Sequence, residues 1–83
     1  MGVERKVHVS ALKHGIEAAD SLRAAEQVLL SEYLDEENPS RQFRLGVDSS
    51  GRILELVVLI FDRRRELIIH SMKARREYLD FLP

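Results

Sequence analysis

The chain has 83 residues, of which 45% are hydrophobic and 33% are charged, and its formal net charge at pH 7 is −1. This balance is typical of a small globular protein and excludes an intrinsically disordered chain. There is no cysteine, which excludes disulfides, cysteine zinc sites and thiol catalysis. The sequence therefore predicts one small domain over residues 1–83.

The apolar segments indicate a soluble cytoplasmic protein rather than a membrane protein. The longest apolar run, Ile53 to Ile60, is interrupted by Glu55 and is far shorter than the roughly 20 residues that span a bilayer. The N-terminal segment MGVERKVHV lacks the apolar stretch of a secretory signal. The absence of cysteine fits a reducing compartment.

Charge is distributed unevenly along the chain. Residues 1–40 carry four Lys or Arg against eight Asp or Glu, whereas residues 41–83 carry nine against six. This polarity is compatible with an anion site on the second half, and with a partner chain that contacts either pole. The net charge of the whole chain, which is near zero, argues against nonspecific binding along nucleic acid.

Two helices are predicted in the first half. Val9–His14 is expected to form a short helix that stops at Gly15, because glycine is common just past a helix end. A longer amphipathic helix is predicted over Ala18–Glu32. Its apolar residues recur at spacings of three and four, at Ala18, Leu22, Ala25 and Leu29.

An acidic break at Leu34–Ser40, which contains Asn-Pro, is followed by a change of period from helical to two. In QFRLGV, Gln42 to Val47, apolar and polar residues alternate, which predicts a strand with one buried and one wet face. Asp48 to Gly51 supplies the residues of a tight turn, and a hairpin is expected there.

Two further strands and a final helix complete the predicted order. Ile53–Phe61 is apolar at eight of nine positions, which favours a central strand covered on both faces. The polar connection Asp62–Arg65 leads to a strand over Glu66–Ser71, and helical periodicity returns from about Lys73. The expected fold is α+β, with two N-terminal helices, an antiparallel sheet of three or four strands and a C-terminal helix.

Three stretches, taken in order, resemble a known family. KHGIEAADSLRAAEQVL resembles the Lys-His-Gly opening and amphipathic helix of the BrnT toxins, which belong to the RelE-like ribonuclease superfamily. GVDSSGRILELVVL resembles that family's glycine, short turn, Gly-Arg and apolar strand, and IIHSMKARREYL stands in the place of its last strand and basic C-terminal helix. The resemblance covers roughly Ser10 to Glu77.

The resemblance implies a RelE-like fold and a toxin of a type II toxin–antitoxin pair that cuts RNA without a metal. The implied partner is an antitoxin with a ribbon-helix-helix DNA-binding domain, and the complex would repress its own operon. The isolated chain as a homodimer and the complex as a heterotetramer both stay open. The chain departs from the family where Met72 and Lys73 replace two arginines, and lysine lacks the bidentate fork of arginine. The alternative is therefore an inactive binding protein that only pairs with an antitoxin or with nucleic acid.

Metal-independent RNA cleavage requires a base near the 2′-hydroxyl, an acid near the leaving oxygen and cations around the phosphorane. His, Lys and Arg can supply all three. The residues expected to be catalytic come from the Lys-His-Gly motif and the last strand and helix: His14, His70, Lys73, Arg75 and Arg76. The residues expected to bind RNA backbone are Lys13, Arg44 and Arg52.

Each of these groups also has a structural interpretation. His14 can cap a helix end, and His70, which faces away from the core if Ile69 faces it, can be satisfied by a neighbouring polar group. The two RNA-binding arginines can instead form cross-strand ion pairs with Glu55 or Glu66. The three histidines lack short ligand spacing and the glycines are isolated, so neither a metal nor a cofactor is expected.

Overall fold

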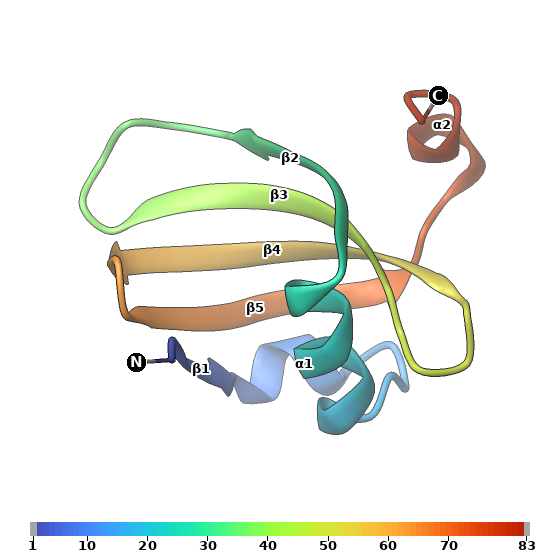
Figure 1. Ribbon diagram of the computed structural model, residues 1–83, viewed down its shortest axis with the longest axis horizontal. Coiled ribbons are helices and arrows are strands. Elements are labelled where there is room, and N and C mark those ends of the chain that lie inside the picture. The colour runs from blue at the N-terminus through green and yellow to red at the C-terminus, as the bar shows by residue number, and fades with distance from the viewer. Residues whose placement is uncertain (1, 83) are drawn as a thin grey trace.

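The computed structural model describes residues 2–82, and its main feature is a five-stranded mixed sheet (Figure 1). The elements in chain order are β1 (Glu4–Val7), a 3₁₀ turn η1 (Val9–Leu12), α1 (Ala18–Glu26), β2 (Val28–Tyr33), β3 (Ser40–Val47), β4 (Ile53–Asp62), β5 (Arg65–Lys73) and α2 (Arg76–Leu79). The strand order is β1-β5-β4-β3-β2. β1 runs parallel to β5, and the other neighbouring pairs are antiparallel.

The predicted fold, with two N-terminal helices and an antiparallel sheet of three or four strands, is therefore wrong. The expected helix Val9–His14 is only the 3₁₀ turn η1, which ends before Gly15 at a φ of 81°. The last third of the expected helix Ala18–Glu32 belongs to the edge strand β2. β1, at the opposite edge, was not predicted at all.

α1 ends early because Gln27 is held by a neighbouring strand. Its φ of −100° and ψ of 66° leave the helical region. Its carbonyl accepts from the N–H of Val47 at 3.0 Å, and its side-chain Nε2 donates to the carbonyl of Val47 at the same distance. The residues that follow, Val28–Tyr33, then pair antiparallel with β3 as an edge strand.

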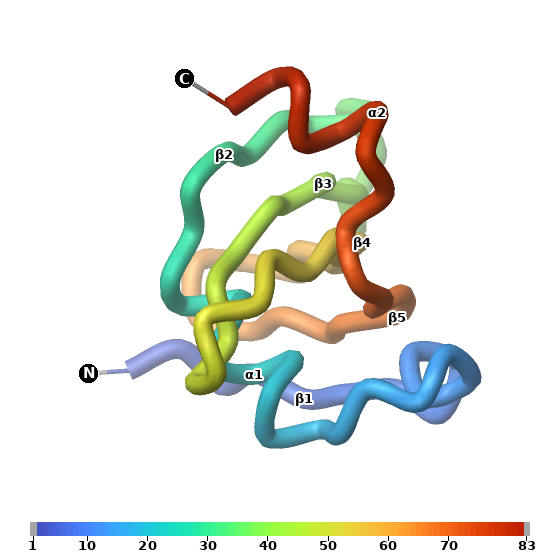
Figure 2. Tube along the Cα trace, turned by 90° about the vertical axis from the view of Figure 1, so that its right-hand side faces the viewer, coloured from blue at the N-terminus to red at the C-terminus, as the bar shows by residue number. Residues whose placement is uncertain are grey.

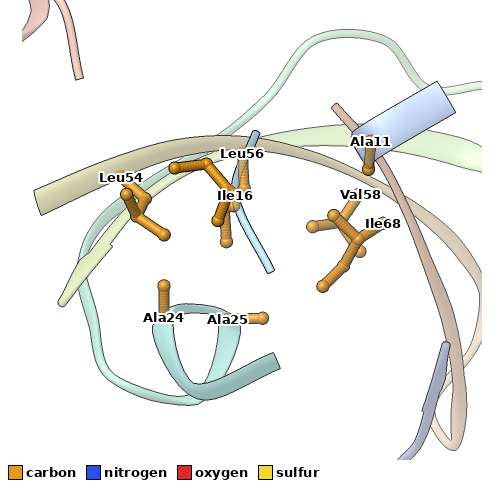
Figure 3. Packing of buried hydrophobic residues seen from close by; sticks show 8 residues of the cluster. All are labelled: Ala11, Ile16, Ala24, Ala25, Leu54, Leu56, Val58 and Ile68. Carbon is orange, nitrogen blue, oxygen red and sulfur yellow. The ribbon is translucent and has the colours of Figure 1, made fainter. Parts of the chain in front are cut away.

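The hydrophobic core lies between α1 and the sheet. Alternate residues of β4, Leu54, Leu56 and Val58, are fully buried on the side that faces α1. In Figure 3, Ala24 points from α1 toward Leu54, and Ala25 points to the side on which Ile68 lies. Ile16, Ala11 and Ile68 complete the cluster. Two alanines on the contact face allow the helix to approach the sheet closely.

The three predicted strands coincide with β3, β4 and β5, and the predicted turn joins the first two. Asp48 Oδ1 accepts from the backbone N–H groups of Ser50 and Arg52, both at 2.9 Å, and Gly51 has a φ of 84°. The predicted turn is thus formed as expected, because the Asp48 side chain binds the turn backbone and Gly51 adopts a positive φ.

The C-terminal helix is shorter than predicted. An extended link through Arg75 precedes α2, which has only four residues and none of them buried. Figure 2 shows β3, β4 and β5 between α2, at the top, and α1, near the bottom. α2 contacts the sheet through Tyr78, whose ring centroid lies 4.9 Å from that of Phe43. Within residues 2–82, no helix is long and apolar enough to cross a membrane.

Candidate functional site

Glu55, in the middle of β4, is the centre of a polar cluster on the sheet face that points away from α1. Its neighbours along the strand, Leu54 and Leu56, point into the core, so the alternation of a strand turns Glu55 to the other side. Only 1% of the residue is exposed. A charged group at this depth requires partners.

Arg75 supplies most of these partners. Its backbone N–H and its Nε donate to Oε1 of Glu55 at 3.1 and 3.0 Å, and its Nη2 donates to Oε2 at 2.9 Å. Burial alone would raise the pKa of Glu55, but the bonds from Arg75 and His70 together lower it below the usual range. Glu55 is therefore an ionised carboxylate at neutral pH.

His70 is the third member of the cluster. Its Nε2 lies 3.2 Å from Oε2 of Glu55. Because an ionised carboxylate only accepts, Nε2 is the donor to Glu55, and in the neutral tautomer of His70 the lone pair is then on Nδ1. One quarter of the His70 side chain is exposed. This arrangement allows a neutral histidine to act as a general base while a carboxylate fixes its orientation.

A β-bulge determines the direction in which His70 points. Val57 pairs with His70, but the next residue, Val58, pairs with Ile68, so Ile69 is an extra residue in β5. Ile68 is fully buried in the core, whereas Ile69 and His70 both line the opposite face. The expected alternation of Ile69 and His70 is therefore wrong, because the bulge interrupts it.

His14, from the loop after η1, lies beside His70. The two ring centroids are 5.5 Å apart and the rings meet edge to face at 78°. His14 is exposed. The structure thus brings together three of the five residues expected to be catalytic, His14, His70 and Arg75, from segments that are far apart in the chain.

A cleft of about 510 Å³ opens over this cluster. Its volume is within the usual range for small-molecule sites. The wall combines the polar cluster with aliphatic and aromatic side chains from β2, β3 and the C-terminal segment. The lining residues are Leu30, Glu32, Leu34, Arg41, Phe43, Glu55, Val57, Ile69, His70, Arg75, Tyr78 and Phe81.

Replacing Glu55 by glutamine is expected to lower the free energy of unfolding by about 2 kcal/mol at pH 7, because bonds to a charged group are lost. The folded-state pKa is lowered, so the contribution of Glu55 is complete above its unfolded pKa of about 4.3 and is lost as pH falls through the folded pKa. Urea unfolding of the wild type and of Glu55→Gln from pH 3 to pH 8 measures the difference in stability between them. A difference between them that stays constant down to pH 3 would contradict the assignment.

The remaining expected catalytic residues lie outside the cluster. Lys73 is the last residue of β5, is exposed, and pairs with Leu54, whose side chain belongs to the opposite face. Arg76 is the exposed first residue of α2. Lys13 is exposed at the end of η1, one residue before His14.

The expected RNA-binding arginines are not on the face of His70. Arg44 points to the α1 side, where 7% of it is exposed and its two Nη atoms donate to Glu66 at 3.0 and 2.8 Å. Arg52 pairs with Asp48 at 2.7 Å and Asp20 at 3.2 Å beside the turn. The alternative interpretation, an ion pair with Glu66, is confirmed for Arg44. Arg44 lies on β3 and Glu66 on β5, so the pair reaches across β4, which separates these two strands.

The predicted site residues did not include Glu55, which was considered only as an ion-pair partner of Arg44 or Arg52, and the aromatic contact between Phe43 and Tyr78 was not predicted. The available signal for Glu55 was its position as the one charged residue in an apolar central strand, since a buried charge must be paired. No comparable signal existed for the aromatic contact, because α2 and β3 are distant in sequence.

Among residues 2–82 there is no group of three or more His, Cys, Asp or Glu side chains that could hold a metal ion. The titratable side chains that the structure brings together at the site are Glu55, His70, His14 and Arg75. No protein-family model, curated protein or solved structure matches the chain.

Proposed function

We propose that the protein is a metal-independent RNA endonuclease that acts as the toxin of a toxin–antitoxin pair in the cytoplasm. The observation that carries this proposal is the pairing of His70 with the buried, ionised Glu55 in an open cleft beside a second histidine. The resemblance of KHG, GVDSSGR and IIHSMKA to BrnT toxins supports the biological role.

The cluster can divide the reaction between two histidines. Nδ1 of His70 removes the proton from the 2′-hydroxyl, whose oxygen attacks the adjacent phosphorus. His14 donates a proton to the 5′-oxygen as its bond to phosphorus breaks. The products are a 2′,3′-cyclic phosphate and a 5′-hydroxyl.

Arg75 can stabilise the charge that develops on the phosphate oxygens. Its Nε and Nη2 are bound to Glu55, whereas Nη1 makes no hydrogen bond within the described residues, and 49% of the side chain is exposed. A guanidinium held on one edge and free on the other is already oriented for an anion.

The test is cleavage of single-stranded RNA by the purified protein in EDTA, with analysis of the product ends. Replacing His70 by glutamine is expected to reduce the rate by about 10²–10⁴-fold, the usual contribution of a general acid–base group. The matched control is His8→Gln, because the His8 side chain is exposed, lies outside the cleft and binds only Ser10 near η1. Equal rates for the wild type and His70→Gln would refute the assigned role.

The apolar lining of the cleft favours a second candidate, a protein that binds an antitoxin or nucleic acid without catalysis. Six of its lining residues are aliphatic or phenylalanine: Leu30, Leu34, Phe43, Val57, Ile69 and Phe81. Expression separates the two candidates, since the endonuclease arrests growth and the His70→Gln variant relieves the arrest. Purification from the native operon tests the ribbon-helix-helix partner, which both candidates share.

A further inference from the structure

The wall of the cleft on the β2 side carries two charged residues that the proposed cleavage reaction does not use. Glu32 on β2 is directly opposite Phe43 on β3. Arg41 is two residues before Phe43, and its carbonyl accepts from the N–H of Leu34 at 2.8 Å. Glu32 and Arg41 are therefore diagonal neighbours on one face of the sheet, and both line the cleft.

These two side chains have hydrogen-bonding capacity to spare. Within residues 2–82, the carboxylate of Glu32 takes part in no hydrogen bond or salt bridge. Arg41 donates from Nε to Oδ2 of Asp35 at 2.7 Å, which fixes its orientation and leaves its Nη groups for a ligand. Glu32 thus offers two acceptor oxygens and Arg41 offers its Nη donors, next to the apolar side chains that line the cleft.

Aromatic side chains stand at the same cleft. Phe43 and Tyr78 contact each other, and Tyr78 is also covered by the guanidinium of Arg75 at 5.1 Å. Phe81 lines the cleft but is 68% exposed. An exposed aromatic ring on a cleft wall is suited to stacking against a flat, partly polar ring such as a nucleobase.

We propose that the cleft holds a guanine base next to His70, with Glu32 as the residue that determines this specificity. The two oxygens of a carboxylate match the adjacent N1–H and N2–H donors of guanine, and the guanidinium of Arg41 matches its O6 acceptor. Adenine would place its N1 lone pair against the carboxylate and its amino group against the guanidinium. Phe81 stacks on the ring, and the ribose and phosphate reach His70.

This inference rests on the proposed function, because it names the base at which the same site acts. The two ideas can nevertheless be tested separately, since binding of a nucleotide does not require cleavage. The probes are 3′-GMP, 3′-AMP and 3′-IMP, titrated into the full chain and followed by NMR. The wild type is expected to bind 3′-GMP at least about tenfold more tightly than 3′-AMP, with 3′-IMP between them because it lacks the N2 amino group.

The specificity variant is Glu32→Gln, which retains the size of the side chain and removes its charge. It is expected to lose the preference for 3′-GMP, whereas Glu36→Gln, also exposed but outside the cleft, is expected to retain it. Both sites are exposed, so circular dichroism should show the same fold in both variants.

The outcomes distinguish the two ideas. Cleavage of RNA with equal binding of the three nucleotides overturns the guanine subsite and leaves the endonuclease in place. A preference for 3′-GMP that depends on Glu32, without any cleavage, supports the subsite and overturns the endonuclease. Preferential binding of 3′-GMP that survives Glu32→Gln overturns the role of Glu32.

Discussion

Replacing Gly46 by alanine is expected to lower the free energy of unfolding by about 3 kcal/mol or more, a large part of the total for a small domain. A Cβ atom on Gly46 would lie 1.9 Å from the carbonyl oxygen of Ala24 and 2.7 Å from its carbonyl carbon. Both atoms belong to the backbone of α1, so no side chain can rotate away. The helix itself would have to move off the sheet.

Movement of α1 would open the core, because Ala24 and Ala25 are buried against the fully buried residues of β4. Urea denaturation monitored by circular dichroism measures the loss. The matched control is Gly2→Ala, where a Cβ would have nothing within 4 Å, and its midpoint is expected to be unchanged. A Gly46→Ala variant as stable as the wild type would contradict the close contact between the backbone of α1 and Gly46.

The strands β3, β4 and β5 could be predicted because each carries its own signal. A period of two, a run of branched residues and the Asp48–Gly51 turn all act within a few residues. The same local signals mislead at residues 28–32, where the helical spacing of Ala18, Leu22 and Ala25 continues into Leu29. There the antiparallel pairing with β3 prevails over local periodicity and adds β2 to the edge of the sheet.

β1 has no signal that a local pattern could detect. Its four residues, Glu4–Val7, are mostly charged, and they form a strand only because β5 offers a free edge parallel to them. Parallel pairing joins residues about 60 positions apart, as in Glu4 with Arg65. Such contacts are decided by the folded topology and not by neighbours in the sequence.

The sequence predicted which types of residue form the candidate site, but it did not predict how they are arranged in space. The basic and imidazole groups near residues 14 and 70 were identified from their chemistry, and His14 and His70 do meet. The orientation of His70 depends on the bulge at Ile69, and its partner Glu55 depends on which face of β4 is open. Neither the bulge nor the open face can be deduced from composition or spacing.

A Glu66→Gln substitution is expected to lower the free energy of unfolding by about 3 kcal/mol at pH 7, the usual cost of removing one partner from a buried ion pair. Glu66 binds Arg44 through both oxygens and also accepts from Nε of Arg5 at 2.8 Å. The side chains of Arg44 and Arg5 are only 8% and 15% exposed, so water cannot replace the carboxylate easily. Chemical denaturation measures the loss, and Glu4→Gln, which removes an exposed carboxylate 4.0 Å from Lys6, is expected to have little effect.

The pH dependence and a double-mutant cycle separate this ion cluster from simple packing. Burial alone would raise the pKa of Glu66, but the bonds from Arg44 and Arg5 lower it. Its contribution to stability is therefore complete above its unfolded pKa of about 4.3 and is lost as pH falls through the folded pKa. Wild type and Glu66→Gln should therefore converge in stability at acidic pH.

Because Arg44 and Glu66 share one network, their substitutions are not expected to be additive. The double variant Arg44→Gln with Glu66→Gln is expected to lose less free energy of unfolding than the two single variants together, by about 1 to 3 kcal/mol. Additive losses would show that the two residues stabilise the sheet independently, and that Arg44 is held by Gln42 and the carbonyl of Ala25 instead.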